Sequence, residues 1–410
     1  MTRHLRRSRL VLAFAAVLGL PAAADAAPMI VDLAPGSDPA AVAAAAGVTP
    51  EVVFDESGEG FAADLTNAQA TKLRRAAAVT AVRSDGIVAR LAARPAPPEQ
   101  SAQVVRVAQR RVGLLASPTA DVDGTDDRRI DVDIAVFDGG IDPTHPELDV
   151  VGGADCTVGK GWKDRDGHGT MVAGIAAAID NDAGMAGIAP GARLWAIRIA
   201  NPDGFISDSA LRCGLEWLVR HAKKIEVANW SFGEGEPGSG ACGTRGSTIF
   251  DVQHRLTCLA VARGVTIVGA AGNESEDAGR WAPAAWPQVI AVSATTETDG
   301  LPGGLGPNSV CWPDERDDTF AFFSDFGSAV DIAAPGVCIT STFPGGGYAF
   351  SDGTSFATPF VSGAAALVMA RNPSTTPAQV RQILLARAEP GPIAGDPDAF
   401  PEPFLNVAGL

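Results

Sequence analysis

The chain has 410 residues, of which 46% are apolar, and a formal net charge of −16. This apolar share is typical of packed globular domains and argues against a fibrous or mostly disordered protein. The acidic balance disfavours binding to phosphate backbones, which depends on clustered Lys and Arg, so we expect no nucleic-acid partner.

The N-terminus has the pattern of a cleavable secretory signal. Four arginines between Arg3 and Arg9 precede an apolar run from Leu10 to Leu20, and small residues lead on to Ala27. A bilayer-spanning helix needs about 20 apolar residues, so this run is too short to span. We therefore predict a signal peptide over residues 1–27 and a secreted protein with no membrane association after cleavage. Twin-arginine export and a signal anchor are the alternatives to general secretion.

Residues 28–93 are predicted to form a small α+β domain. The expected elements are a strand at 29–35, a helix at 38–47, a hairpin at 52–65, a helix at 67–77 and a strand at 79–88. Their β-α-β-β-α-β order is that of a ferredoxin-like fold.

The segment 94–111 is predicted to be a linker. Pro95, Pro97 and Pro98 prevent regular structure at its start. An exposed stretch of this kind is accessible to a protease, so we interpret it as a processing region.

Residues 112–410 alternate between short runs rich in β-branched residues and helical stretches. The strands are expected at 130–138, 192–199, 227–232, 265–272 and 289–296, and the helices at 168–178, 208–221, 251–263 and 356–371. This alternation predicts a doubly wound α/β domain, with a mostly parallel sheet and helices on both faces. In such sheets, sites gather at the carboxyl ends of the strands.

The chain has six cysteines, all within this second domain. An even number in an exported chain indicates disulfides, and no pair has the C-x-x-C spacing of a zinc site. We expect Cys242 to pair with Cys258, because that loop is the shortest, and then Cys311 with Cys338 and Cys156 with Cys213. The alternative is that some are free buried thiols.

Three glycine-flanked motifs supply the parts of a nucleophilic serine site, in the chain order Asp, His, Ser. Asp138, in VFDGGID, ends a predicted strand, where a carboxylate can orient an imidazole. His168, in DGHGTMVAG, opens a helix and would act as general base. Ser355, in DGTSFATP, opens another helix, with Pro359 in the first turn. Each motif alone is weak and is more often turn chemistry; their joint occurrence favours catalysis.

A fourth polar residue, Asn273, ends the strand run VTIVGAAGN. Its side-chain amide and the backbone N–H of Ser355 would together form an oxyanion hole. The sequence has no Gly-x-Ser-x-Gly elbow and no His-Glu-x-x-His, which disfavours an α/β-hydrolase esterase and a zinc protease.

Together these motifs resemble those of the subtilisin-like serine proteases, the subtilases, over nearly the whole chain after the signal. The resemblance implies a serine-type endopeptidase with Asp138, His168 and Ser355 as its triad and Asn273 as oxyanion donor. It implies an acyl-enzyme intermediate and no cofactor for catalysis. It also implies that residues 28–93 are an inhibitory propeptide, so that the protein is made as a self-inhibited precursor. We expect a monomer that acts on protein or peptide substrates.

Three positions depart from the family pattern. Gly139 stands where Thr or Ser usually follows the aspartate, Met171 where a second His usually stands, and Phe356 where Met is more frequent after the nucleophile. None of these changes removes a group that transfers protons. The alternative to an enzyme is a catalytically silent subtilase-like protein with a binding or structural role, against which the four intact positions argue.

The resemblance further indicates where substrate and calcium would bind. The primary specificity pocket would be lined by Ser231, Phe232, Gly233, Ala271 and Gly272. Residues 204–209 would form an edge strand to which peptides add by backbone hydrogen bonds. Glu147 and Asn181 would hold a structural calcium ion, the alternative being a capped helix end with solvated acids. Glu234 and Glu236 are interpreted as a solvated acidic loop rather than as a basis for basic-residue preference.

Overall fold

The computed structural model describes residues 26–56, 58–90, 102–157, 159, 161–233, 242 and 249–410. Most of the predicted signal, the first part of the predicted linker and the acidic loop with Glu234 and Glu236 lie outside these residues.

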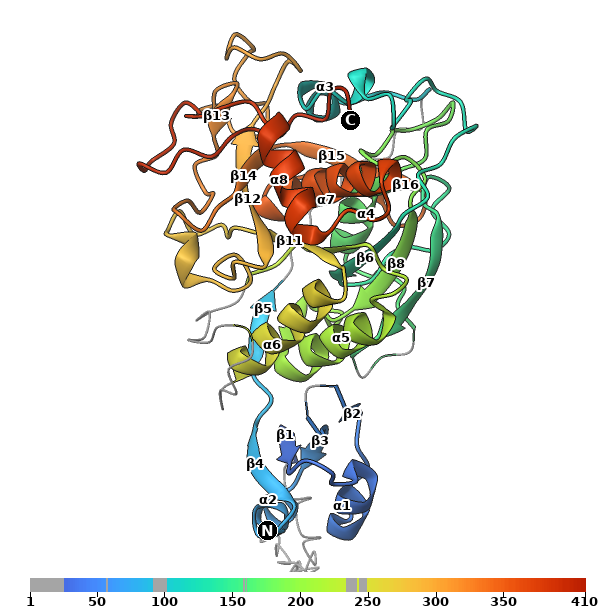
Figure 1. The fold of residues 1–410 in the computed structure, drawn as a ribbon, viewed down its shortest axis with the longest axis vertical. Coiled ribbons are helices and arrows are strands. Elements are labelled where there is room, and N and C mark those ends of the chain that lie inside the picture. Colours follow the sequence, from blue (N-terminus) through green and yellow to red (C-terminus); the bar gives the residue numbers. More distant parts are fainter. Residues whose placement is uncertain are drawn as a thin grey trace, which may run out of the picture.

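The N-terminal domain is a four-stranded antiparallel sheet with two helices (Figure 1). Its elements are β1 (Ala27–Leu33), α1 (Pro39–Ala46), β2 (Val52–Phe54), β3 (Gly60–Leu65), α2 (Asn67–Arg74) and β4 (Val79–Ser84). The strand order is β2-β3-β1-β4, and Val31, Phe61 and Leu73 belong to its buried core. Asp38 caps α1, and Thr66 forms a capping box with Gln69 in α2, which satisfies backbone donors at both helix starts. This is the predicted β-α-β-β-α-β order.

The last predicted strand of this domain is divided in two. β4 ends at Ser84, and β5 (Ile87–Arg90) pairs antiparallel with β9 (Phe205–Ser207) of the larger domain. The division occurs at Asp85, whose carboxylate accepts hydrogen bonds from the backbone N–H and the hydroxyl of Ser209, in the first turn of helix α5 (Asp208–His221). The contact with Ser209 thus interrupts the run 79–88, which the sequence predicts as one strand.

The larger domain is built on a mostly parallel sheet with strand order β13-β12-β11-β10-β6-β8-β7, to which β14 adds beside β12. The strands are β6 (Asp133–Asp138), β7 (Val150–Asp155), β8 (Arg193–Arg198), β10 (Val227–Trp230), β11 (Thr266–Ala270), β12 (Val289–Thr296), β13 (Thr319–Phe320) and β14 (Ile332–Pro335), with a separate hairpin of β15 (Ile339–Phe343) and β16 (Gly347–Ser351). The helices are α3 (Val107–Arg111), α4 (His168–Ala177), α5, α6 (Ile249–Ala262), α7 (Thr354–Arg371) and α8 (Pro377–Arg387), with short 3-10 turns η1 (Leu114–Ala116) and η2 (Ala278–Arg280).

Helices cover both faces of this sheet, as predicted. Alternate residues of β6 divide between the faces: Ile134 and Val136 belong to the core under α4 and α7, whereas Ala135 and Phe137 belong to the core under α5 and α6. Figure 1 shows α5 and α6 on one side of the sheet and α4, α7 and α8 on the other. The fully buried strand β6 is apolar on both faces, which is the pattern of a parallel sheet covered by helices.

The three expected disulfides are present: Cys156–Cys213, Cys242–Cys258 and Cys311–Cys338. Cys156, directly after β7, is thus joined to Cys213 in α5. No helix in the described part of the chain is long and apolar enough to span a membrane.

The predicted linker does not extend as an open segment to residue 111. Ala102 forms a β-bridge with Ala183, and α3 buries Ala108 and Arg111 against the larger domain. Ala108 packs in the core, and Arg111 forms ion pairs with Glu297, Asp318 and Glu389 of the larger domain. The prolines that suggested a linker all lie before this stretch.

Ion pairs hold the two domains together. The guanidinium of Arg212 in α5, 1% exposed, donates to Asp32 in β1 at 2.8 Å and lies 3.7 Å from the centre of the Phe54 ring. Arg220 pairs with Asp55 at 2.7 Å. Arg212 also donates to the Gly58 carbonyl at 3.0 Å and lies 3.6 Å from Glu216 Oε1 in its own helix. Asp32 is therefore the acidic partner that the N-terminal domain itself contributes to this buried charge.

We expect Asp32→Ala to loosen this docking by about 2 kcal/mol, since Arg212 keeps its burial and loses a charged hydrogen bond. Hydrogen exchange of the full-length protein would show faster exchange at β2 and α5. Asp64→Ala, which removes an exposed acid from the same domain, is the control and should leave exchange unchanged. Equal exchange in both variants would contradict the prediction.

Candidate active site

The polar residues of the three motifs gather at the carboxyl edge of the central strands. Asp138 is the last residue of β6, and Ser231 follows β10, the neighbouring strand. From β6 the sheet continues through β8 and β7 on one side and through β10, β11 and β12 on the other. The strand order therefore reverses direction at β6. At such a point a doubly wound sheet leaves a crevice at its carboxyl edge.

Asp138 and His168 form a buried pair. His168 Nδ1 lies 2.8 Å from Asp138 Oδ2, and the two residues are 2% and 0% exposed. His168 is the first residue of α4, and a Cβ on the following Gly169 would lie 2.1 Å from the carbonyl oxygen of Gly140. Only glycine therefore allows α4 to start this close to the Asp138 turn. The contact with Asp138 occupies Nδ1 and leaves Nε2 as the nitrogen that can accept a proton from another group.

The environment raises the pKa of His168. Burial lowers it, but the charge and hydrogen bond of Asp138 and the charges of Asp166 and Asp164 outweigh that effect. The Phe356 ring lies 5.1 Å from the imidazole, centre to centre, and covers it with an apolar surface.

Ser355 lies in the first turn of α7, which begins at Thr354, two residues earlier than predicted. Pro359 consequently lies in the second turn, not the first, so the carbonyl oxygen of Ser355 lacks its i+4 amide donor. The hydroxyl of Ser231 donates to this oxygen at 2.6 Å, and the hydroxyl of Ser355 donates to the carbonyl of Ser231 at 2.9 Å. The end of β10 thus fixes Ser355 through two reciprocal hydrogen bonds, and the Ser355 hydroxyl is not directed to His168 in this arrangement.

Asn273 lies three residues beyond β11 and is oriented by Thr354. Its Oδ1 accepts hydrogen bonds from the backbone N–H of Thr354 at 2.8 Å and from the Thr354 hydroxyl at 3.0 Å. Because these two donors identify the oxygen end of the amide, Nδ2 is the end left to donate to a ligand. The exposed Asn273 amide and the N–H groups of the first turn of α7 are therefore brought together.

Most of the residues predicted to line a specificity pocket are buried. Ser231 is fully buried and supports Ser355, and Ala271 is fully buried and packs in the small cluster with Ala278, Ala284 and Ala291. Phe232 is 4% exposed and stacks on Trp230. A Cβ on Gly233 would lie 3.8 Å from the Ala282 carbonyl oxygen, whereas Gly272 has φ 123° and a Cβ there would lie 2.1 Å from Asp325 Oδ2. Ser231 therefore shapes the site through its hydrogen bonds to Ser355, and Ala271 through packing.

The structure shows what surrounds Gly139 and Met171, two of the positions that depart from the family pattern. A Cβ on Gly139 would lie 2.7 Å from Asp166 Oδ2, so this glycine makes room for an additional carboxylate beside Asp138. Burial and the charges of Asp164 and Asp138 raise the pKa of Asp166 to about 6. Met171 is fully buried in the core between α4 and α7. The sequence analysis did not identify Asp166 as part of the site; its place directly before Gly167-His168 was the available signal.

The two residues predicted to bind calcium are also brought together. Glu147 is 2% exposed, and its Oε2 accepts from the Met185 N–H at 3.2 Å. A hydrogen bond from Asn181 acts on the same carboxyl, although burial is the larger influence and raises the pKa of Glu147. Gln103, missed by the sequence analysis, accepts from the Asn181 N–H at 2.7 Å. These groups offer oxygen ligands, which suit a hard cation such as calcium.

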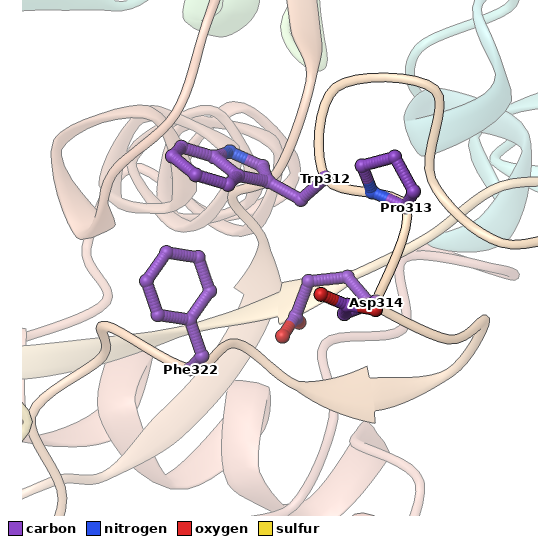
Figure 2. A pocket seen from close by; sticks show the side chains of 5 residues that line it. Trp312, Pro313, Asp314 and Phe322 are labelled. Atoms are coloured by element: carbon purple, nitrogen blue, oxygen red, sulfur yellow. The ribbon is translucent and has the colours of Figure 1, made fainter.

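A surface pocket lies between the loop before β13 and Phe322, which follows that strand. Trp312, Pro313, Asp314, Glu315 and Phe322 line a hollow of about 240 Å³, in which the Trp312 and Phe322 rings meet edge to face (Figure 2). The next residue, Phe323, accepts from the Ser275 N–H at 3.0 Å, two residues after Asn273. The backbone beside the pocket is thus hydrogen-bonded to the segment that carries Asn273, and the sequence analysis did not identify the pocket.

Comparison with known proteins identifies the family. Residues 130–402 match the subtilase family, which is well over half of the chain. The chain belongs to the subtilase family. Subtilisin BL of Lederbergia lenta is 37% identical over 254 residues, covering 62% of this subtilase and 81% of that protein. Subtilisin E of Bacillus subtilis (strain 168) is 38% identical over 262 residues, covering 63% of this chain and 60% of that protein.

A solved structure is also similar. The structure of a cold adapted subtilisin-like serine proteinase aligns with a TM-score of 0.54 at 27% identity, covering 70% of this subtilase and 97% of that chain. The match confirms the predicted α/β fold with its mostly parallel sheet. Family and relatives together make the protein a serine-type endopeptidase.

We expect Asp166→Asn to lower the pKa of His168 in this subtilase, because the substitution removes one of the negative charges that raise it. An NMR titration of the His168 ring in a Ser355→Ala background measures this directly. Asp203→Asn, which removes an exposed acid outside the site, should leave the titration unchanged. An unaltered His168 titration in Asp166→Asn would mean that Asp166 exerts no charge on the imidazole.

Proposed function

We propose that this subtilase is a secreted endopeptidase in which Asp138, His168 and Ser355 hydrolyse peptide bonds. The observation that carries the proposal is the buried 2.8 Å contact between His168 Nδ1 and Asp138 Oδ2 at the carboxyl edge of β6. Ser355 begins a helix beside the neighbouring strand, so nucleophile, base and orienting carboxylate come from three elements that meet at one edge.

Catalysis requires the Ser355 hydroxyl to leave the Ser231 carbonyl and donate to His168 Nε2. His168 accepts the hydroxyl proton while Oγ attacks the scissile carbonyl carbon, and then gives that proton to the leaving amine. Water repeats the sequence in the second half-reaction: His168 takes its proton, the hydroxide adds to the acyl carbon, and Ser355 leaves reprotonated. Asp138 keeps Nδ1 protonated and stabilises the imidazolium in both halves.

Asn273 Nδ2 and the Ser355 N–H would stabilise the oxyanion formed in each half-reaction. The two Thr354 hydrogen bonds to Asn273 Oδ1 hold the amide before substrate arrives, so little reorganisation is needed when negative charge develops. The N-terminus of α7 adds a favourable dipole at the same point.

Protein and peptide substrates would add to the edge strand β9. In the full-length chain this edge is paired with β5, whose carboxyl end leads to residue 91. A strand that occupies the substrate edge supports the proposal that residues 28–93 are an inhibitory propeptide and that the protein is made as a self-inhibited precursor. Secretion is proposed from the N-terminal signal pattern.

Structural calcium is proposed at Glu147 and Asn181. A carboxylate that is 2% exposed is costly when charged, and a cation bound by the Glu147 Oε atoms would offset that cost. The Asn181 Oδ1, which here accepts from the Ala183 N–H at 2.8 Å, would have to turn toward Glu147 to join the coordination. Its role would be to stabilise the loop that follows α4, and no catalytic step involves it.

Substitution of the proposed nucleophile tests the function directly. We expect Ser355→Ala to reduce casein hydrolysis to background and to abolish labelling by a fluorophosphonate. Asn273→Ala should lower kcat by about 10²–10³ with little change in KM, a loss measured in subtilisin itself rather than calculated from these distances. Asn372→Ala, at the opposite end of α7, is the matched control. If the processed wild-type protein neither cleaves nor reacts, the silent subtilase-like alternative holds.

Self-processing gives a second test. We expect wild type to release its N-terminal domain by cleavage between Arg90 and Ala102, because β5 ends at Arg90 and Ala102 is already bridged to the larger domain. Ser355→Ala should remain a single chain, as judged by intact mass. Unaided release of the same segment from Ser355→Ala would refute autocatalytic processing.

A further inference from the structure

The pocket of Figure 2 combines aromatic surface with negative charge. The Trp312 and Phe322 rings form one wall, with their centres 5.0 Å apart and their planes at 64°. Asp314 and Glu315 bring two carboxylates to the same hollow of about 240 Å³. The two aromatic residues are 38% and 52% exposed, so the rest of the chain does not cover them. The rings and the carboxylates are therefore open to a ligand from solution.

The loop that carries Trp312 is held in place by its own contacts. Cys311 is joined by a disulfide to Cys338, directly before β15. Within the loop, the Ser309 N–H donates to the Glu315 carbonyl at 2.9 Å, and the Glu315 N–H donates to the Trp312 carbonyl at 2.9 Å. The pocket is thus formed before a ligand arrives, which lowers the entropy cost of binding.

The two carboxylates have no ion-pair partner in the described part of the chain. Glu315 Oε2 accepts from the Thr296 hydroxyl at 2.7 Å, and the Asp314 side chain makes no hydrogen bond or ion pair there. Arg316, the next residue, lines a separate hollow that includes Glu389. A cationic ligand would therefore meet two carboxylates without having to displace an internal ion pair.

The same combination of groups surrounds an arginine at two other places in this chain. The Arg212 guanidinium lies 3.7 Å from the centre of the Phe54 ring and pairs with a carboxylate of β1. The Arg111 guanidinium lies 4.0 Å from the centre of the Phe404 ring and pairs with Glu389. An aromatic face attracts a cation, and the carboxylate adds complementary charge. The pocket of Figure 2 has rings and carboxylates, but no described arginine or lysine lines it.

The pocket lies near the segment that carries Asn273. The Ser275 N–H donates to the Phe323 carbonyl at 3.0 Å, and Phe323 directly follows Phe322. Three chain steps of about 3.8 Å and one backbone pairing of about 5 Å separate Asn273 from Phe322, so their Cα atoms are at most about 16 Å apart. An extended peptide of about five residues spans this distance. A substrate held at the proposed active site would therefore reach the pocket.

We propose that this pocket binds a lysine or arginine side chain of the protein substrate, within about five residues of the scissile bond. The cationic group lies against the Trp312 and Phe322 rings and donates hydrogen bonds to Asp314 and Glu315. The pocket thereby adds affinity for basic stretches of a protein, apart from the groups that act on the scissile bond. The inference rests on the proposed endopeptidase function for the identity of the ligand, whereas binding itself can be measured without hydrolysis.

Binding to the full-length Ser355→Ala protein tests the pocket alone. The probe is N-acetylarginine methylamide, and N-acetylnorleucine methylamide is the uncharged control. The indole N–H of Trp312, identified by its loss in Trp312→Phe, should shift in the NMR spectrum with the arginine probe only. Asp314→Asn should weaken this binding about fivefold, because it removes one exposed charge partner. Asp127→Asn, which removes an exposed acid ahead of β6, is the matched control and should leave binding unchanged.

Cleavage by the processed protein tests the role in substrate recognition. A set of peptides shares one cleavable core and carries a single arginine at successive positions, up to about five residues on either side. At one or two positions, arginine should raise kcat/KM about fivefold over citrulline, a neutral side chain of similar shape. Asp314→Asn and Trp312→Leu should remove this advantage, and Asp127→Asn should keep it. Added salt should reduce it, because exposed charges are screened.

The results distinguish a failure of this proposal from a failure of the proposed function. An unmoved Trp312 resonance, or an equal shift with the norleucine probe, overturns the cation pocket whether or not the protein cleaves peptides. If cleavage occurs but arginine gives no advantage, or keeps its advantage in Asp314→Asn, the role in substrate recognition is overturned. If Ser355→Ala binds the arginine probe but processed wild type cleaves nothing, the endopeptidase function fails and the pocket binds a cation that is not a substrate. Asp314 is exposed and unpaired among the described residues, so Asp314→Asn should fold and decides alone if Trp312→Leu does not.

Discussion

The burial of α7 is the constraint on which the arrangement of the site depends. The helix contacts β10, β11, β12 and β14 of the sheet and also its neighbours α4 and α8, so its axis has little freedom. Small residues make this possible: a Cβ on Gly363 would lie 2.6 Å from Ile188 Cβ and 2.9 Å from the Ala176 carbonyl oxygen. With the helix fixed, its first turn reaches the carboxyl edge of the sheet at one position only. Ser355 and the Thr354 groups that hold Asn273 are placed by packing rather than by local turn preference.

The same constraint explains the role of Ser231. Pro359 removes one backbone donor from α7, and a buried carbonyl without a partner is unfavourable. The Ser231 hydroxyl supplies the missing hydrogen bond to Ser355, and Asn229 in turn donates to Ser231 Oγ at 2.9 Å. A chain of polar contacts thus links β10 to α7 inside an otherwise apolar core. The proline is tolerated because the neighbouring strand provides a substitute donor.

Much of this organisation could be predicted from the sequence. The runs of β-branched residues gave the five central strands, because strands buried on both faces need continuous apolar sequence. The three motifs and Asn273 were identified because glycine spacing and chain order carry specific information. What the sequence did not provide depends on distant contacts. β7 (Val150–Asp155) is rich in glycine because Gly152 and Gly153 pack against Trp195 and Trp162, and no local pattern indicates a strand. Asp85, Asp166 and Gln103 acquire their roles only from partners brought close by folding.

The pairing of β5 with β9 has a consequence for how the two domains depend on each other. Because both belong to one chain, the N-terminal domain meets its surface at an effective concentration on the order of millimolar, whatever the concentration of the protein. Exposed ion pairs of this interface, such as Arg220–Asp55, can therefore be weak and still remain formed beside the buried Arg212–Asp32 pair. Once the connection is cut, the same contacts become a bimolecular equilibrium, and dilution and salt both shift it toward separation. Covalent continuity thus adds to the contacts of Arg212, Arg220 and β5 in keeping the edge strand covered.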